Sequence, residues 1–244
     1  MKNLLTAIAF IALISLSIVY YAKGNQMKKI GIIVAMDKEL ELFASDLTNS
    51  TEQTLHQRRF VEGTISGKRV VIVVSGIGKV NAALCTADLI NHFKVDMVIN
   101  IGISGGLDGS LNIGDFVVGD DLVYHDYDTG AEIQQDVPDR FHSTAELTAL
   151  FPDLKHGLLC TGDQFIAQHD SLMAIKKKYP NALAVDMESA AIAHTCHLHD
   201  IPVLSVRQIS DTPGIEHHTE QYETFWKNAS SQSIKLLKAL LEKL

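Results

Sequence analysis

The chain has 244 residues, of which 46% are hydrophobic, and its formal net charge is −8 at pH 7. This composition fits one domain with a substantial core, and the acidic balance argues against nucleic acid as the main partner while it suits a small-molecule enzyme. The three cysteines are too few, and odd in number, for a disulfide framework.

Residues 1–24 have the layout of a secretory signal peptide. A basic start precedes an apolar run over residues 4–22, and the small residues Ala22 and Gly24 suit a cleavage site. We therefore expect export, to the periplasm or, if the run is kept as an anchor, to a membrane-attached position facing outward. Translation from Met27 would instead leave the protein in the cytoplasm.

From residue 28 onward, short apolar runs alternate with segments that repeat apolar residues at helical spacing. We expect strands over residues 29–35, 57–65, 69–75, 95–101, 115–124, 155–160, 182–185 and 203–209. We expect helices over residues 38–47, 80–93, 143–150, 171–179, 187–199 and 220–244. This alternation implies one α/β domain, residues 27–244, with a mixed or mostly parallel sheet covered on both faces.

Carboxylates stand at the ends of two of these apolar runs. Asp186 and Glu188 flank a methionine where a strand meets a helix, and Asp211 follows the strand over residues 203–209. Open α/β sheets bind ligands at the carboxyl ends of their strands. Each acid alone has a simpler interpretation as a helix N-cap or first-turn residue. The set as a whole indicates a catalytic site.

Two glycine-rich segments also follow strands, Ser75-Gly76-Ile77-Gly78-Lys79 and Gly102-Ile103-Ser104-Gly105-Gly106-Leu107. Glycines permit positive φ and close approach of the backbone to a ligand. Neither segment has the spacing of a dinucleotide fingerprint or of a Walker loop. Each alone is compatible with an ordinary tight turn, but together they frame a pocket for an uncharged polar ligand such as a nucleoside.

These features form part of a longer motif series. The series is Ile30-Gly31-Ile32-Ile33-x-Ala35-Met36 with Glu39, Ser75-Gly76-Ile77-Gly78-Lys79-Val80, Asn100-x-Gly102-x-x-Gly105-Gly106-Leu107, Gly114-Asp115, Tyr124-His125-Asp126, Gly162-Asp163-x-Phe165-Ile166, Ala184-Val185-x-Met187-Glu188 and Ile209-Ser210-Asp211. In order and spacing it resembles the 5′-methylthioadenosine/S-adenosylhomocysteine nucleosidases of the purine nucleoside phosphorylase superfamily. The resemblance implies a three-layer sandwich, with a mixed, mostly parallel sheet flanked by helices.

The resemblance also implies hydrolysis of the N-glycosidic bond of methylthioadenosine, S-adenosylhomocysteine or a related adenine nucleoside. Asp211 would protonate N7 of the leaving adenine, Glu39 would activate water, and Glu188 would hold the ribose hydroxyls. The sugar becomes oxocarbenium-like, as in glycoside hydrolysis. Asp211 must therefore hold a proton at neutral pH while Glu39 stays ionised, a separation that burial and hydrogen bonding can produce.

Further positions carry over from the family as substrate contacts. Met187 would pack under the ribose, Phe165 would stack on the purine, and the Ile166 backbone would bond the purine edge. Ser210 would contact the substrate beside Asp211. Phe225 would close over the 5′ side.

The chain departs from the family pattern in three places. Ile103 stands where the family usually has a small hydroxyl residue near the proton donor, with Ser104 next to it. We expect Ile103 to line the substrate site and to change substrate preference or weaken catalysis. Asp186 replaces a more usual glutamate, and the loop over residues 126–142 is unlike the family pattern, which leaves the 5′ substituent open.

Two other functions stay open, a phosphate-dependent purine nucleoside phosphorylase and an exported surface-binding protein with residual nucleosidase activity. The first glycine-rich segment carries no arginine, and Arg207 lacks a phosphorylase context, so water is favoured over phosphate. The family needs no cofactor and no metal. It implies a homodimer, with Tyr124 and residues 125–140 as interface candidates and the neighbouring subunit closing the 5′ end of each site.

Overall fold

The computed structural model describes residues 28–128, 138–212, 218–228 and 232–244. The expected leader, residues 1–24, and part of the expected surface loop lie outside these ranges. Within the ranges, no helix combines the length and the apolar character that a membrane crossing needs.

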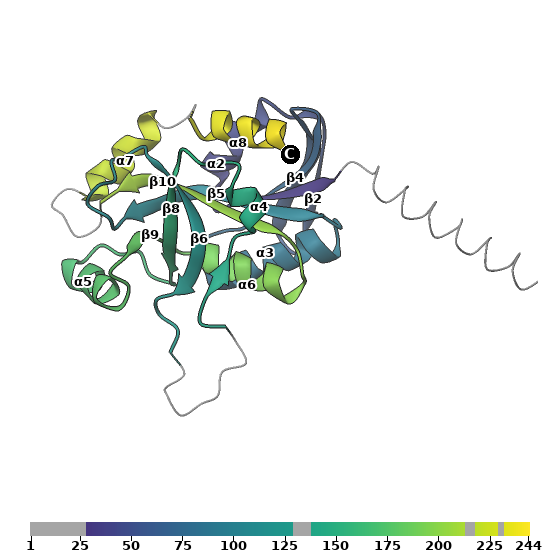
Figure 1. Ribbon diagram of the computed structural model, residues 1–244. Helices are drawn as coiled ribbons and strands as arrows, with labels where there is room; N and C mark the ends of the chain where they lie inside the picture. The colour runs from purple at the N-terminus through teal and green to yellow at the C-terminus, as the bar shows by residue number, and fades with distance from the viewer. Residues whose placement is uncertain (1–27, 129–137, 213–217, 229–231) are drawn as a thin grey trace, which may run out of the picture.

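Strands and helices alternate along the chain (Figure 1). The strands are β1 (Lys29–Val34), β2 (Thr48–Leu55), β3 (Arg58–Ile65), β4 (Lys68–Val74), β5 (Met97–Gly106), β6 (Phe116–Tyr124), β7 (Phe141–His142), β8 (Lys155–Thr161), β9 (Ala182–Asp186) and β10 (Val203–Asp211). The helices are α2 (Asp37–Ala44), α3 (Lys79–Asn91), α4 (Ala145–Thr148), α5 (His169–Lys178), α6 (Ser189–Leu198), α7 (His218–Asn228) and α8 (Gln232–Lys243).

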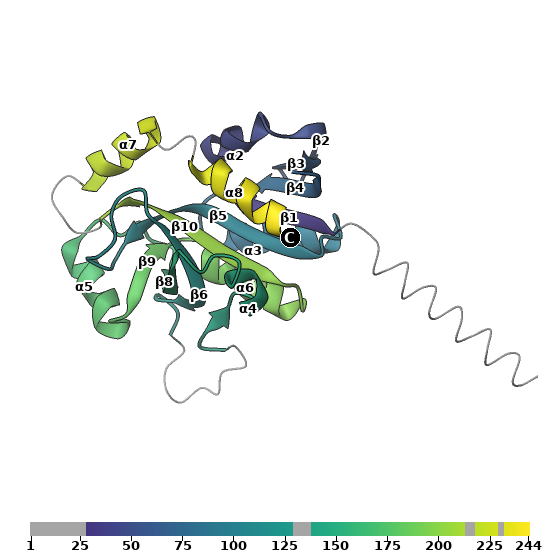
Figure 2. The same cartoon turned by 45° about the horizontal axis from the view of Figure 1, so that its top comes forward.

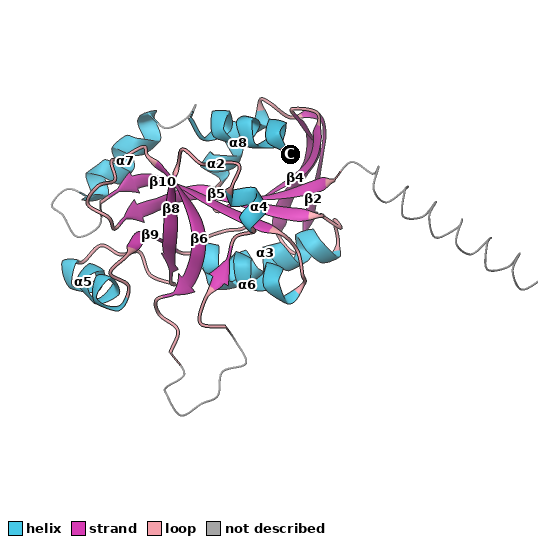
Figure 3. Cartoon of the chain, in the orientation of Figure 1, coloured by secondary structure: helices cyan, strands magenta, loops and turns pink. Residues whose placement is uncertain are grey.

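The fold is mixed α/β, and its strands form one sheet of order β10-β6-β8-β9-β5-β1-β4-β3-β2, with β7 added to β6 (Figure 3). Because β10 also pairs with β5, the strands β5, β9, β8, β6 and β10 close into a ring from which the other strands extend. In the described part of the chain, five pairings are parallel and five antiparallel. The sheet is therefore mixed, as expected, but it is not mostly parallel, and its ring of strands is not clearly the middle layer of the sandwich that we expected.

The closure depends on β5, which changes neighbours along its length. Its first half pairs with β1 as far as Asn100, whereas Gly105 and Gly106 pair with β9. Glycines inside a strand often mark a bend or a close approach of another group. The second glycine-rich segment, which we expected to be a turn, thus belongs to β5 as far as Gly106.

Helices cover the sheet on two sides, with α2 and α8 on one side and α3 and α6 on the other (Figure 2). Because side chains alternate along β1, they point to both sides of the sheet. Ile32 packs in the cluster that contains Leu40 and Leu237, and Ile33 packs in the cluster that contains Leu89 and Ile192. Strand β1 is thus buried on both faces, as its continuous apolar run predicts.

Three further regions differ from the predicted elements, the first being the short strand β7, which lies in the expected surface loop. Strand β2, over residues 48–55, was not predicted, because it is a polar edge strand whose side chains are almost all exposed and which shows no apolar alternation. The long helix expected over residues 220–244 is two helices, α7 and α8.

Candidate active site

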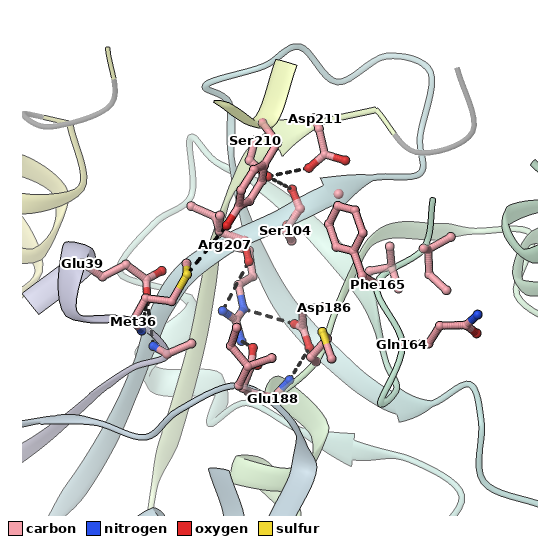
Figure 4. Close-up of a pocket in the computed structure, with 18 residues that line it drawn as sticks. Met36, Glu39, Ser104, Gln164, Phe165, Asp186, Glu188, Arg207, Ser210 and Asp211 are labelled. Atoms are coloured by element: carbon pink, nitrogen blue, oxygen red, sulfur yellow. Dashed lines mark hydrogen bonds and ion pairs between the residues drawn. The ribbon is translucent and has the colours of Figure 1, made fainter. Parts of the chain in front are cut away.

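A pocket opens where β5, β9 and β10 end and where α2 and α6 begin (Figure 4). It contains about 650 Å³ of free space including its mouth, a size that suits a small organic ligand. Of the nine site residues predicted from the sequence, eight line it, namely Glu39, Ile103, Phe165, Ile166, Met187, Glu188, Ser210 and Asp211. Residues from distant parts of the chain, some of them 160 or more positions apart, therefore meet in this pocket.

Glu39 lies in the first turn of α2 and is buried, with 4% of its surface exposed. Its Oε2 accepts hydrogen bonds from the backbone N–H groups of Ala35 (2.7 Å) and Met36 (2.9 Å), so the carboxylate caps its own helix. Its Oε1 meets no hydrogen-bond partner among the described residues. Burial raises the pKa of Glu39 to about 7, although Arg207 and the two backbone N–H groups oppose this rise.

Glu188 stands directly before α6 and joins two parts of the pocket wall. Its Oε1 accepts a hydrogen bond from the backbone N–H of Gly78 (3.0 Å), and its Oε2 lies 3.4 Å from Arg207 Nη2. Burial raises the pKa of Glu188, and the Arg207 guanidinium opposes this rise. The first glycine-rich segment, where Gly76 and Gly78 have φ values of 80° and 98°, is thereby held against the start of α6.

Asp211 ends β10 and is buried beside Ser210. The Ser210 hydroxyl lies 2.6 Å from Asp211 Oδ1 and 3.2 Å from the Ser104 carbonyl oxygen. The Ser210 hydroxyl can share its one proton between these two acceptors, or it can donate to Ser104 while a protonated Asp211 donates to Ser210. The local geometry therefore accommodates an Asp211 that carries a proton.

Arg207 forms the floor of the pocket and was not predicted as a site residue. It is fully buried in β10, and its Nε donates to Asp186 Oδ2 (3.1 Å) and to Ser189 Oγ (3.0 Å). Burial by itself would lower the pKa of Arg207, but the surrounding carboxylates of Asp186, Glu188 and Glu39 hold it above its ordinary value. The signal available in the sequence was an arginine inside a strand that was expected to be buried, where a charge is costly unless it is paired.

The mouth of the pocket is formed by Ile77, Phe165 and Tyr222. Phe165 is 51% exposed, and its ring lies 6.0 Å from that of Tyr222 at an interplanar angle of 71°. An exposed aromatic face at a pocket mouth offers a surface on which a flat ligand can stack. The pocket thus combines an apolar, aromatic mouth with carboxyl groups at its walls and floor.

Residues 29–242 match the sequence model of the Phosphorylase superfamily. Over 229 residues the chain is 40% identical to a 5′-methylthioadenosine/S-adenosylhomocysteine nucleosidase of Staphylococcus aureus, an alignment that covers 88% of this chain and all of that protein. This chain belongs to that nucleosidase family.

Solved structures of the family have the same fold as this nucleosidase. The enzyme of Neisseria meningitidis, in complex with methylthio-immucillin-A, gives a TM-score of 0.83 at 35% identity and covers 89% of this chain and 100% of its own. The enzyme of Colwellia psychrerythraea, in complex with adenine, gives a TM-score of 0.83 at 36% identity and covers 90% of this chain and 96% of its own.

One predicted contact of the nucleosidase lies elsewhere. Phe225 is buried, with 6% of its surface exposed, and it does not line the pocket, whereas Tyr222, one helical turn earlier on α7, does. The predicted helix therefore lies over the pocket, and the structure places Tyr222, three residues before Phe225, in its lining.

The first glycine-rich segment is also tied to the loop that carries Phe165. The backbone N–H of Lys79 donates to Asp163 Oδ1 (2.7 Å), and its ammonium contacts Asp126 Oδ1 (2.7 Å) and Asp163 Oδ2 (3.7 Å). The backbone N–H of Asp163 in turn donates to Asp126 Oδ2 (2.8 Å). These contacts form a clamp, Lys79–Asp126–Asp163, which joins the start of α3 to the segments that follow β6 and β8.

Proposed function

We propose that this nucleosidase hydrolyses the N-glycosidic bond of 5′-methylthioadenosine and S-adenosylhomocysteine, releasing adenine and the ribose derivative. The observation that carries the proposal is that Glu39, Glu188 and Asp211, from three distant parts of the chain, line one pocket. In Figure 4, Glu39 and Asp211 lie on opposite sides of that pocket. A base for water and an acid for the leaving group can therefore act from two sides of one substrate.

The chemistry follows from this arrangement. Asp211 donates its proton to N7 of adenine as the bond between the base and C1′ breaks, and the electron pair of that bond leaves with the purine. The ribose becomes oxocarbenium-like, and water adds to C1′. Glu39 Oε1, which has no hydrogen-bond partner among the described residues, takes a proton from the water. Solvent then returns Asp211 and Glu39 to their starting protonation states.

Glu188 and Arg207 support this step from the floor of the pocket. Glu188 would accept hydrogen bonds from the ribose hydroxyls and place negative charge close to the developing cation. Met187 would pack under the sugar, and the aromatic mouth at Phe165 would take the purine, with the Ile166 backbone at its edge. Ser210 would contact the substrate beside the proton donor.

The charges of the pocket favour water over phosphate as the nucleophile. Among its described lining residues, Arg207 is accompanied by the carboxyl groups of Glu39, Asp186, Glu188 and Asp211. Two of these acids already lie 3.1 and 3.4 Å from the guanidinium. A phosphate dianion would enter a site whose single positive charge is neutralised and whose other groups repel it.

The test is product analysis with the purified protein and methylthioadenosine, in buffer without phosphate and with phosphate added. A hydrolase releases adenine and methylthioribose at the same rate in both buffers. A phosphorylase releases adenine only with phosphate and forms methylthioribose 1-phosphate, which would overturn the proposal. The rates of adenine release from S-adenosylhomocysteine and adenosine, measured in the same assay, show which 5′ substituent is preferred.

We further propose that the nucleosidase is a homodimer. Support comes from α3, whose Val80 and Leu84 are 69% and 52% exposed, and from Leu198 on the neighbouring α6, which is 70% exposed. Large apolar side chains that are exposed in the single chain favour burial against a partner. Sedimentation should give a dimer for the natural protein and a monomer for Leu84→Glu; a natural protein that sediments as a monomer at micromolar concentration would contradict this proposal.

Export is proposed from the sequence of residues 1–24 alone. Cell fractionation with antibody detection, combined with the mass of the purified protein, tests it. Recovery outside the cytoplasm with residues 1–24 removed supports a cleaved leader. Cytoplasmic recovery of a chain that starts at Met27 would contradict export.

A further inference from the structure

Asp186 is a buried carboxylate with no capacity left for a substrate. Its Oδ1 accepts hydrogen bonds from Thr161 Oγ1 (2.7 Å) and from the backbone N–H groups of Glu188 and Ser189 (3.0 Å each). Its Oδ2 accepts hydrogen bonds from Arg207 Nε (3.1 Å) and from the Ser189 hydroxyl. Five donors fill both oxygens, so any effect of Asp186 on a reaction passes through these neighbours.

The Oδ1 contacts determine where Glu188 lies. The N–H groups of Glu188 and Ser189 are at the start of α6, where backbone donors have no partner within the helix. A carboxylate at this end satisfies them and interacts favourably with the helix dipole. Thr161, which donates to Asp186, also accepts the N–H of Ala190 (2.9 Å), so the first turn of α6 is anchored at several points.

The Oδ2 contacts determine where Arg207 lies. With Nε held by Asp186, the other nitrogens of the guanidinium face the pocket, where Nη1 lies 3.4 Å from the Ile103 carbonyl oxygen and Nη2 lies 3.4 Å from Glu188 Oε2. Both of these contacts are long, so the short contacts to Asp186 and Ser189 carry most of the orientation. Asp186 also neutralises much of the positive charge that Arg207 would otherwise present to Glu39 and Glu188.

We propose that Asp186 is a positioning residue for hydrolysis, which holds Arg207 and the start of α6 so that Glu39 and Glu188 face the nucleoside in working geometry and charge. This inference rests on the proposed function. An aspartate suits both tasks at once, because its short side chain reaches the N–H groups two and three residues ahead. A glutamate would carry the carboxylate about 1.5 Å further from the backbone and away from those groups.

The test compares Asp186→Asn with Asp186→Glu. The asparagine keeps the size of the side chain but removes the charge and one acceptor oxygen. We expect kcat/KM for methylthioadenosine to fall about 100-fold, as a displaced catalytic constellation does. The acidic limb of the kcat/KM profile should also move to lower pH, because the uncompensated guanidinium favours ionised Glu39 and Glu188. The glutamate keeps the charge and is the more usual residue of the family here, so kcat should fall less than in the asparagine variant, with the acidic limb unmoved.

Asp108→Asn is the matched control, because Asp108 is a partly exposed acid paired with Lys155 at 3.5 Å, and we expect it to keep the natural rate and profile. A merely structural role would lower the rate of Asp186→Asn without moving its acidic limb, and that result overturns the proposal, as does an unchanged rate. If Asp186→Asn does not fold, an Asp186→Glu variant whose acidic limb moves to lower pH, although the carboxylate charge is kept, overturns it. If the natural protein releases no adenine, the proposed function fails, and a carbon-13 titration of Glu39 in the natural and Asp186→Asn proteins still decides the effect of the charge.

Discussion

Glu39 and Arg207 approach each other over the backbone of Gly102. A Cβ on Gly102 would lie 2.9 Å from Glu39 Oε1 and 2.5 Å from Arg207 Nη1, closer than real Cβ atoms come to neighbouring groups. Glycine is therefore required here by the close approach of two charged side chains to a strand. We infer that the attacking water lies in the space above Gly102, within reach of Glu39 Oε1.

Gly102→Ala should block that space. The added methyl group must displace Arg207 or Glu39, so we expect kcat/KM for methylthioadenosine to fall about 100-fold or more. Gly109→Ala is the matched control, because a Cβ at Gly109 meets nothing within 4 Å, and its rate should equal that of the natural protein. Equal activity of the two variants would show that the space above Gly102 is not used.

The pH dependence of kcat/KM should report Glu39. Burial raises the pKa of Glu39 to about 7, and the base acts only when it is ionised. The rate should therefore rise with pH and be half-maximal near pH 7 on the acidic side. A half-maximal point near pH 4.5, the ordinary value for glutamate, would mean that Glu39 is solvated in the working enzyme or is not the base.

Substitution of Tyr222 should weaken substrate binding, whereas substitution of Phe225 should lower the stability of the fold. Tyr222 lines the pocket beside Phe165, so Tyr222→Ala should raise KM about 3- to 10-fold, in line with the loss of one aromatic contact, and change Tm little. Phe225 is buried outside the pocket, so Phe225→Ala should lower the free energy of unfolding by about 3 kcal/mol. The reverse pattern would restore Phe225 as the substrate contact.

The clamp Lys79–Asp126–Asp163 should affect binding more than chemistry. Lys79→Met removes the ammonium that joins the two loops but keeps the backbone hydrogen bond to Asp163. Partly exposed ion pairs contribute little, so we expect KM to rise about 2- to 5-fold with kcat unchanged. Lys155→Met is the control, because it removes a different surface ion pair, the one between Lys155 and Asp108. A loss confined to kcat would assign Lys79 to the chemical step.

His156 should make stability depend on pH near neutrality. Burial alone would lower the pKa of His156, but the Phe151 carbonyl oxygen (2.8 Å) and Asp120 (2.9 Å) hold it above its usual value. A raised pKa in the folded state stabilises the protein fully below about pH 6.5, and this contribution is lost as pH rises through the folded value. The Tm difference between the natural protein and His156→Gln should thus shrink from pH 6 to pH 9. A difference that grows would reverse the sign.

Much of the site was predictable because its acids stand at strand and helix ends. Glu188 stands before a helix and Asp211 ends a strand, positions that the sequence pattern itself indicates, whereas Glu39 was selected through the family resemblance. Periodicity located β1 and α3 for the same reason, since apolar runs and helical stripes are local properties of the chain.

The closed ring and the floor of the pocket depend on pairings that periodicity does not encode. β10 pairs with both β5 and β6, about 100 and 90 residues away in the chain. That double pairing places Arg207 beneath the pocket among carboxylates contributed by other segments. In the sequence, Arg207 appears only as one charged residue within a predicted strand. Edge strand β2 was not predicted because both of its faces are exposed, so its sequence has no apolar pattern.

The central claim is that Asp211 protonates the departing adenine in a reaction with water. The most direct measurement is adenine release from methylthioadenosine in phosphate-free buffer, by the natural protein and by Asp211→Asn. We predict release by the natural protein and a loss of about 100-fold or more in the variant, whose amide cannot supply the proton, with methylthioadenosine still bound. Equal release by the two proteins would contradict the account.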